Sequence, residues 1–227
     1  MDASDAYRIS PAQRLMRLPR FLVSTLRIAW HHPQSFLPLW AEVNPSVRGW
    51  LRLPDAHFLY EAARSGPRQG AIVEIGSAFG RSTVFLARGA MDAGRERVTA
   101  IDPHTGSELD SVDAESPRAE FQRNLVAHGV ADHVDLVTTT AEAAAIAMPP
   151  EPIRLLFIDG LHTYEAVAAD IRDWAPRVVP GGIIVFDDYM NPDPTFGVKR
   201  AVDEMVASGI VEPRLRTIFN LTWTLRA

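Results

Sequence analysis

The chain has 227 residues, of which 47% are hydrophobic and 22% are charged, with a formal net charge of −5 at pH 7. These totals are those of a single globular domain with room for an N-terminal extension, and the acidic balance argues against a partner role for nucleic acid. The absence of cysteine excludes disulfides, thiolate metal sites and cysteine nucleophiles. No apolar run reaches the roughly 20 residues of a membrane span, and the N-terminus lacks a secretion signal, so we expect a cytoplasmic protein.

Residues 1–68 differ in character from the rest and are predicted to form an N-terminal helical extension. Prolines at positions 11, 19, 33, 38, 45 and 54 divide this region into short helices. A helix over residues 19–31 has an apolar face. We expect this face to pack on the domain, to cover a ligand or to form a homodimer contact, and binding to a membrane surface is the less favoured alternative. A further helix, over residues 55–64, ends at Gly66 and Pro67.

From Gly70 onward, short apolar segments alternate with helical ones, which predicts a doubly wound α/β domain over residues 69–227. Strands are predicted at residues 71–74, 97–101, 134–137, 153–158 and 183–186, with a final antiparallel pair at 215–219 and 221–226. Helices are predicted at residues 80–91, 117–128, a short one opened by Thr140, 163–174 and 196–207. Ser116 is the expected N-cap of the second of these helices.

A glycine turn follows the first strand and predicts a nucleotide-type site. Gly76 and Gly80 frame the turn, Ser77 lies between them, and Ser82 stands in the first turn of the next helix. Glycine permits torsions and close approaches that a Cβ would block, and the helix N-terminus presents free N–H groups. The dinucleotide pattern G-x-G-x-x-G is absent, and Glu74 at the strand end suits a cationic ligand better than a pyrophosphate. An ordinary strand-to-helix turn is the alternative.

Two more strand ends are expected to contribute to a nucleoside site. Asp102 ends the second strand, where a carboxylate can bind the two ribose hydroxyls of an adenosine ligand. Thr140, Ala141 and Glu142 follow the third strand, where adenine would lie. The alternatives are a surface aspartate at Asp102 and a plain N-cap at Thr140.

Three aspartates at the ends of the fourth and fifth strands predict a site for a divalent cation. Asp159 ends the fourth strand, and Asp187 and Asp188 end the fifth. Because the carboxyl ends of parallel strands open onto one edge of the sheet, these side chains are expected in the same crevice as the glycine turn. Crowded carboxylates share protons or bind a cation, and oxygen ligands favour Mg²⁺, with Ca²⁺ or Mn²⁺ as alternatives. An Asp188 that faces solvent is the competing interpretation.

His162, three residues after Asp159, is the candidate general base. It is expected at the mouth of the same crevice, and imidazole is the side chain most often used as a general base. A metal ion lowers the pKa of an acceptor hydroxyl and fixes its direction, and an alcohol needs this activation more than an amine does. His104, on the loop after Asp102, is a second possibility for the base, and a surface helix cap is the alternative role for His162.

Residues from about 70 to 206 resemble the class I S-adenosylmethionine (SAM) methyltransferases, in particular the branch of macrocin and other sugar O-methyltransferases. Four motifs in the right order carry the resemblance: Val73-Glu-Ile-Gly-Ser-x-x-Gly-Arg-Ser-Thr83, Phe157-Ile-Asp-Gly-x-His-x-Tyr-Glu-Ala-Val167, Pro180-Gly-Gly-Ile-Ile-Val-Phe-Asp-Asp-Tyr189 and Gly197-Val-Lys-Arg-Ala-Val-Asp203. The resemblance implies a Rossmann-like sheet of seven strands with a reversed last strand, SAM as cofactor, and Mg²⁺ at Asp159, Asp187 and Asp188.

The same resemblance defines the expected reaction. Catechol-type relatives carry a catalytic lysine three residues after the first metal aspartate, and His162 stands there in this chain, so the expected base is His162 or Asp159. Metal-bound acceptors in these families present two adjacent oxygens, which makes a vicinal diol of a sugar or glycoside the leading acceptor. A catechol or phenol acceptor is the second possibility, and a SAM-binding subunit without catalysis is the third. His104, Tyr164 and Tyr189 are assigned to the acceptor site, and the acidic loop over residues 107–115 is a candidate lid.

Overall fold

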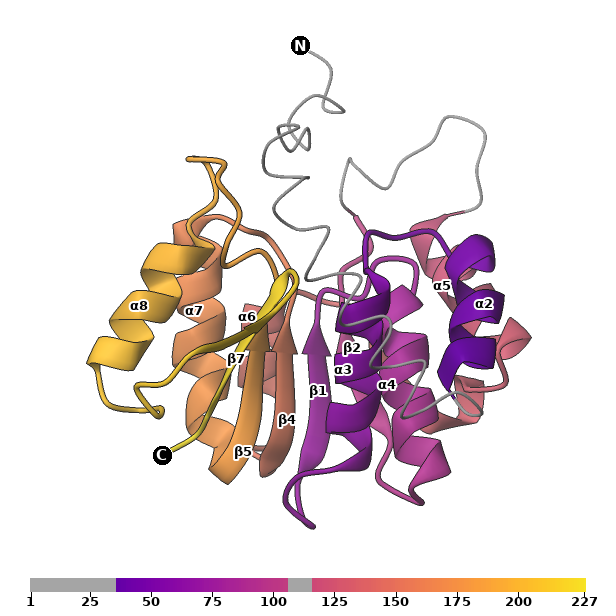
Figure 1. The fold of residues 1–227 in the computed structure, drawn as a ribbon, viewed down its shortest axis with the longest axis horizontal. Helices are drawn as coiled ribbons and strands as arrows, with labels where there is room; N and C mark the ends of the chain where they lie inside the picture. Colours follow the sequence, from indigo (N-terminus) through magenta and orange to yellow (C-terminus); the bar gives the residue numbers. More distant parts are fainter. Residues whose placement is uncertain (1–35, 106–115) are drawn as a thin grey trace.

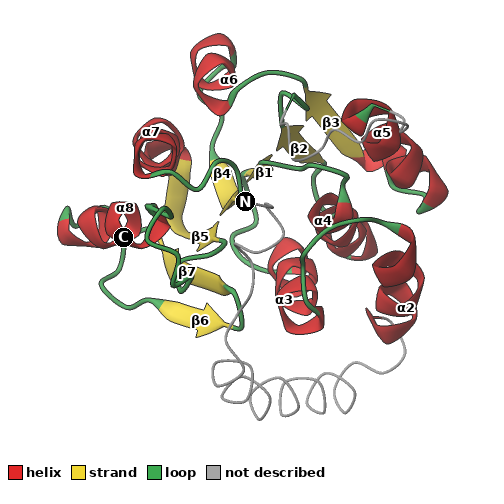
Figure 2. Ribbon diagram, turned by 90° about the horizontal axis from the view of Figure 1, so that it is seen from above, coloured by secondary structure: helices red, strands yellow, loops and turns green. Residues whose placement is uncertain are grey.

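The computed structural model describes residues 36–105 and 116–227, so the helix predicted over residues 19–31 and the candidate lid lie outside the described residues. The described chain forms one seven-stranded sheet with helices on both faces (Figures 1 and 2). The strand order is β3-β2-β1-β4-β5-β7-β6. Strands β1 to β5 pair in parallel, whereas β7 is antiparallel to both β5 and β6. The Rossmann-like α/β fold with a reversed last strand is therefore confirmed.

The strands and helices predicted within the described residues are present, and most bounds differ by only one to three residues. The strands are β1 (Ala71–Ile75), β2 (Val98–Ile101), β3 (Val134–Val137), β4 (Ile153–Ile158), β5 (Val178–Phe186), β6 (Arg216–Ile218) and β7 (Leu221–Leu225). The helices are α2 (Phe36–Ser46), α3 (Leu53–Arg64), α4 (Arg81–Asp92), α5 (Pro117–Ala127), α6 (Ala141–Ala147), α7 (Tyr164–Trp174) and α8 (Val198–Ala207). Within the two described ranges, none of the helices combines the length and the apolar character that crossing a membrane requires.

Alternate residues of the strands enter two hydrophobic cores, one on each face of the sheet. On one face Ile72 and Phe157 pack with α2, α3, α4 and α5. On the other face Val73 and Leu156 pack with α6, α7 and α8. Because helices cover both faces, the central strands are nearly continuous apolar runs, and every residue of β4 is buried.

The described part of residues 1–68 belongs to the first of these cores. Phe36 of α2 and Leu59 of α3 are fully buried there beside β1 and α4. Pro54 lies in the first turn of α3, where a missing N–H costs nothing. The division at residue 68 marks a change in sequence character, and as a domain boundary it stays a prediction.

One strand is longer than predicted. The Pro180-Gly181-Gly182 segment was expected to precede the fifth strand, but β5 begins at Val178 and contains it. The register between β4 and β5 shifts there, since Ile153 pairs with Val178 and Leu155 with Ile183. The extra residues form an irregular bulge at the amino end of β5, where proline and glycine are tolerated.

A buried arginine fastens α3 to the amino edge of the sheet. Arg154 of β4 donates hydrogen bonds to the carbonyl oxygens of Ala62, Ala63 and Ser65 at the end of α3 and forms an ion pair with Glu96. Burial lowers the pKa of Arg154 to about 10. This buried charge therefore satisfies a helix C-terminus at the edge opposite the candidate site.

Candidate active site

The glycine turn after β1 packs directly against the end of β4. Gly76 has φ +83°, in the left-handed region, and a Cβ added there would overlap the main chain of Asp159. The amide of Asp159 donates to the carbonyl oxygen of Ile75 at 2.8 Å, and the amide of Gly76 donates to that of Ile101 at 2.9 Å. The ends of β1, β2 and β4 are thus joined at the turn.

Gly80 closes this turn and begins α4. Its amide donates to the carbonyl oxygen of Ser77 at 2.7 Å, and its φ of +88° is again left-handed. A Cβ at Gly80 would press on the ring of Phe121 at 3.1 Å. The two predicted turn glycines are therefore required by backbone conformation and by close packing.

Asp102 holds the glycine turn through its carboxylate. Its Oδ2 accepts hydrogen bonds from the amides of Ser77 and Ala78, both at 2.8 Å, and its Oδ1 accepts one from the amide of His104 at 2.7 Å. A carboxylate offers about four lone-pair positions, so Asp102 keeps capacity for a ribose hydroxyl. Ribose binding by Asp102 stays a prediction.

Glu74 is fully buried beside the first turn of α4. Its Oε2 accepts a hydrogen bond from the Thr83 hydroxyl at 2.5 Å, and Ser82 is buried in the same first turn of α4. Burial raises the pKa of Glu74 to about 7. Its Oε1 and the hydroxyl of Ser77 are buried without a hydrogen-bond partner among the described residues. Because buried polar atoms are normally paired, these two fit a polar ligand at the glycine turn.

The segment assigned to adenine forms the start of α6. Thr140 caps this helix, since its Oγ1 accepts a hydrogen bond from the amide of Ala143 at 3.3 Å. The carbonyl oxygen of Ala141 accepts one from the indole of Trp174, and Glu142 is exposed. The N-cap is confirmed, while the contact of these residues with adenine stays a prediction.

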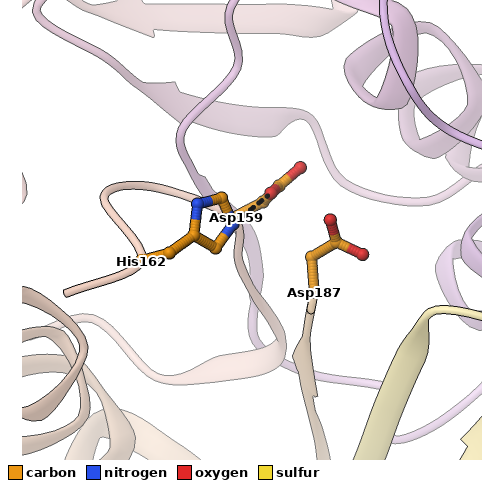
Figure 3. A group of neighbouring side chains, drawn as sticks. All are labelled: Asp159, His162 and Asp187. Atoms are coloured by element: carbon orange, nitrogen blue, oxygen red, sulfur yellow. Dashed lines mark ion pairs between the residues drawn. The ribbon is translucent and has the colours of Figure 1, made fainter. Parts of the chain in front are cut away.

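Asp159, His162 and Asp187 come together at the carboxyl edge of β4 and β5 (Figure 3). Each offers a ligand atom, and these atoms lie within 4.8 Å of one another. Nε2 of His162 is 3.6 Å from Oδ1 of Asp159 and 3.7 Å from Oδ2 of Asp188. Asp188 has φ +55°, a conformation that costs energy in residues other than glycine and that is common at functional sites. Asp159, His162 and Asp187 thus form one group, and Asp188 adjoins this group through His162.

The carboxylates of this group repel one another. Burial and the negative charges of Asp188 and Glu74 raise the pKa of Asp159 well above its ordinary range. Burial and the charges of Asp159 and Asp188 do the same to Asp187, and His162 partly offsets them. Nε2 of His162 is buried without a hydrogen-bond partner in the described part of the chain. Crowded carboxylate oxygens beside an imidazole nitrogen are a donor set that fits a hard divalent cation.

A further carboxylate near this group, that of Asp55, was not predicted from the sequence. Asp55, in the first turn of α3, is 1% exposed, and its Oδ1 accepts hydrogen bonds from the amides of Asn220 at 3.2 Å and Leu221 at 3.4 Å. Burial and the charge of Asp187 raise the pKa of Asp55 to about 8. An acid in a first helical turn is common on exposed helices, so its position alone carries no signal of this role.

The side chain of His104 is buried against main-chain carbonyl oxygens of its own loop and of the glycine turn. Its side chain is 1% exposed, and its ring nitrogens lie 3.1 Å from the carbonyl oxygen of Asp102 and 3.0 Å from that of Ala78. Its ring also packs edge-on against Phe121. These contacts favour a structural role for His104, while its roles as acceptor-binding residue and as base stay predictions.

Tyr164 and Tyr189 are tied to α8. The hydroxyl of Tyr164 donates to Glu204 at 2.7 Å, and that of Tyr189 donates to Asp203 at 2.7 Å. Tyr164 is two residues beyond His162, and Tyr189 directly follows the second aspartate of β5. These hydrogen bonds favour a positioning role, and acceptor contact by the two tyrosines stays a prediction.

Known proteins resemble this chain in sequence and in fold. Residues 73–189, just over half of the chain, match a family described as a methyltransferase domain. The uncharacterized protein y4gI of Sinorhizobium fredii is 30% identical over 168 residues, which are 70% of this chain and 17% of that protein. The 8-demethyl-8-(2,3-dimethoxy-alpha-L-rhamnosyl)-tetracenomycin-C 4'-O-methyltransferase of Streptomyces olivaceus is 25% identical over 170 residues, which are 66% of this chain and 64% of that protein.

The chain therefore spans less than two thirds of the length of either curated relative. Among solved structures, the TDP-rhamnose 3'-O-methyltransferase of calicheamicin biosynthesis is similar with a TM-score of 0.59 at 21% identity. That match covers 100% of this chain and 99% of the other. At this identity the likeness supports the fold.

Proposed function

Because the chain belongs to the methyltransferase family that its residues 73–189 match, we propose that it transfers a methyl group from SAM to a hydroxyl of a sugar or glycoside. The convergence of Asp159, His162 and Asp187 next to the glycine turn carries this proposal. Methyl transfer from SAM is an in-line displacement, so positioning of donor and acceptor supplies much of the rate. The turn and the group of three side chains are the two surfaces that would do this positioning.

The glycine turn is the proposed SAM site. The unpartnered Oε1 of Glu74 and hydroxyl of Ser77 support it, since a ligand with an amino group and hydroxyls would satisfy both. Asp102 would bind the ribose while it holds the turn through the amides of Ser77 and Ala78. Gly80 and Ser82 would keep the helix start close to the ligand.

Mg²⁺ is the proposed ion, held by Asp159, Asp187 and Asp188. When bound, it would lower the pKa of the acceptor hydroxyl and fix its direction. His162 is within reach of the same position, but Nε2 cannot both bind an ion and accept a proton. We assign His162 to the proton because Mg²⁺ prefers oxygen ligands, and Asp188, whose Oδ2 lies 3.7 Å from Nε2 of His162, would supply the third oxygen.

His162 is accordingly the proposed general base. Its Nε2 would accept the proton of the acceptor hydroxyl, and the carboxylates of Asp159 and Asp188, 3.6 and 3.7 Å away, would stabilise the resulting imidazolium. Asp159 is the alternative base, since its carboxylate lies at the same position, 3.6 Å from Nε2 of His162, and burial raises its pKa. Turnover of His162→Ala separates the two, because an unchanged rate moves the role to Asp159.

A sugar hydroxyl is the proposed acceptor. The name of the Streptomyces olivaceus relative describes methylation of a glycosylated tetracenomycin, and the name of the structural neighbour describes methylation of TDP-rhamnose. Both names support a sugar as the methyl acceptor of this chain. A vicinal diol offers two adjacent oxygens to a group whose ligand atoms lie within 4.8 Å of one another.

The proposal is tested by incubating the full chain with radiolabelled SAM, Mg²⁺ and a panel of sugars, glycosides and catechols. We expect label in a sugar or glycoside. Label in catechols alone would favour a catechol or phenolic O-methyltransferase. Calorimetric binding of SAM without label in any acceptor would favour a non-catalytic SAM-binding subunit.

A further inference from the structure

The loop that carries His162 is held by the segment that begins α8. Phe196 lies face to face with the imidazole of His162, with ring centroids 4.7 Å apart and planes 19° apart. The next residue, Gly197, donates its amide hydrogen to the carbonyl oxygen of His162 at 2.7 Å. A Cβ at Gly197 would overlap the main chain of Tyr164, so glycine allows this close approach. Ring and main chain of His162 are thus both in contact with this segment.

The orientation of the imidazole depends on this stack and not on a hydrogen bond from Nε2. That nitrogen has no hydrogen-bond partner among the described residues, and its distances of 3.6 Å to Asp159 and 3.7 Å to Asp188 exceed hydrogen-bond length. The second side-chain torsion of histidine is intrinsically broad. Rotation about it would turn the ring edge into Phe196, so the stack restricts the ring while it leaves Nε2 available.

We propose that Phe196 is a positioning residue for His162, whose ring face keeps Nε2 directed at the acceptor hydroxyl. The proposal rests on the base role proposed above for His162. Phe196 acts through the imidazole, so its loss is expected to slow turnover and to leave cofactor binding intact. A residue that served only to pack the loop would lower stability and binding together.

The test compares two substitutions of Phe196. Phe196→Leu keeps an apolar side chain and removes the planar face, whereas Phe196→Tyr keeps the face. We expect Phe196→Leu to lower kcat by about tenfold or more, as misplaced catalytic groups do, with the KM for SAM and the calorimetric Kd for S-adenosylhomocysteine changed by less than about twofold. Phe196→Tyr should retain nearly the full kcat. Wild-type kcat in Phe196→Leu, or parallel losses of kcat and cofactor binding, would overturn the proposal.

A double-mutant cycle with His162→Ala shows whether the effect passes through the histidine. Phe196→Leu should cause no further loss of kcat in the His162→Ala background, because the group it positions is gone. Multiplying losses would mean that Phe196 acts independently, and the proposal would fail.

A measurement without turnover keeps this inference separate from the proposed reaction. The chain has seven histidines, and the ring-proton signal of His162 is the one missing from the NMR spectrum of His162→Ala. Phe196→Leu should move that signal downfield, since the ring current of the stacked phenyl group is lost, and Phe196→Tyr should not. Wild-type turnover of His162→Ala would refute the base role even where the signal moves. An unmoved signal would refute the stack itself.

Discussion

The carbonyl group of Asp159 lies where a side chain at Gly76 would begin. This contact joins the proposed SAM turn to the first aspartate of the proposed metal site. It therefore fixes how far the methyl donor stands from the group that would activate the acceptor. The left-handed φ of Gly76, +83°, is a second reason for glycine at this position.

Gly76→Ala should lower the free energy of unfolding by about 3 kcal/mol or more, because the methyl group overlaps main-chain atoms that cannot move aside. Gly94→Ala is the matched control. Gly94 is also left-handed, with φ +60°, but nothing lies within 4 Å of an added Cβ, so only the torsional cost of about 1–2 kcal/mol applies. Urea unfolding measures the loss of free energy in both variants. Equal losses would contradict a stabilising contact between Gly76 and the main chain of Asp159.

Asp55 should make the metal-free protein less stable as pH rises. Its pKa is about 8 in the folded chain and ordinarily 3.8, so between these values the folded state binds a proton that the unfolded state has released, and stability falls with increasing pH. Asp55→Asn keeps an oxygen for the two amide hydrogen bonds and removes the titration. We expect its stability to fall less between about pH 4 and pH 8, and to exceed the wild-type value above pH 8.

Urea midpoints from pH 5 to 9 measure this difference. Glu120→Gln is the control. Hydrogen bonding to Arg48 lowers the pKa of Glu120, so its carboxylate is ionised throughout this range, and the Glu120→Gln curve should be displaced from the wild-type curve without a change of slope. Parallel curves for wild type and Asp55→Asn would contradict the assignment of a buried proton to Asp55.

Arg154 should be irreplaceable for stability although it lies far from the candidate site. Arg154→Met leaves three carbonyl oxygens at the end of α3 and the Glu96 carboxylate without their donor, which should cost about 3 kcal/mol or more. Arg154→Lys should not restore the loss, since one ammonium cannot replace a planar fork of donors. Arg97→Met, which removes an exposed ion pair with Asp135, should cost much less. Similar urea midpoints for Arg154→Met and Arg97→Met would refute this account.

Tyr164→Phe and Tyr189→Phe test the positioning role of α8. Each removes a hydroxyl that donates to Glu204 or Asp203. We expect kcat to fall several-fold, because the loops that carry His162 and the β5 aspartates gain freedom, with the acceptor KM changed by less than about twofold. An acceptor KM raised tenfold or more at unchanged kcat would instead place the hydroxyls on the acceptor.

Local signals in the sequence were sufficient for most of the fold. The bounds of β4 were predicted correctly because this strand is buried on both faces and is therefore a continuous apolar run. Ser116 and Thr140 were predicted as N-caps from their residue type and position, and the amide hydrogen bonds that their side chains accept confirm this. The start of β5 was misplaced, since Pro180 and the glycines after it are typical of turns and become part of the strand only through pairing with β4. The bounds of α2 could not be predicted from local sequence either, because the helix continues through Pro45, where it is stabilised by packing on α3 and α4.

The candidate site was predictable as far as topology decides it. Because the carboxyl ends of parallel strands lie at one edge of the sheet, the positions of Asp159 and Asp187 directly after two strands were sufficient to predict that they lie close together. The stack of Phe196 on His162, the burial of Asp55 and the bonds of the tyrosines to α8 depend on segments that are distant in sequence. No periodicity or spacing encodes such contacts. The homodimer and the cytoplasmic location stay predictions.

The measurement that tests the account most directly is methyl transfer to the sugar acceptor before and after complete chelation of divalent cations. With wild-type protein, transfer should fall to background on chelation and return when Mg²⁺ is added in excess. Asp187→Asn should stay at background throughout, whereas Asp173→Asn, at the far end of α7, should behave as wild type. Transfer that survives chelation, or a wild-type rate in Asp187→Asn, would contradict a metal-dependent reaction at these carboxylates.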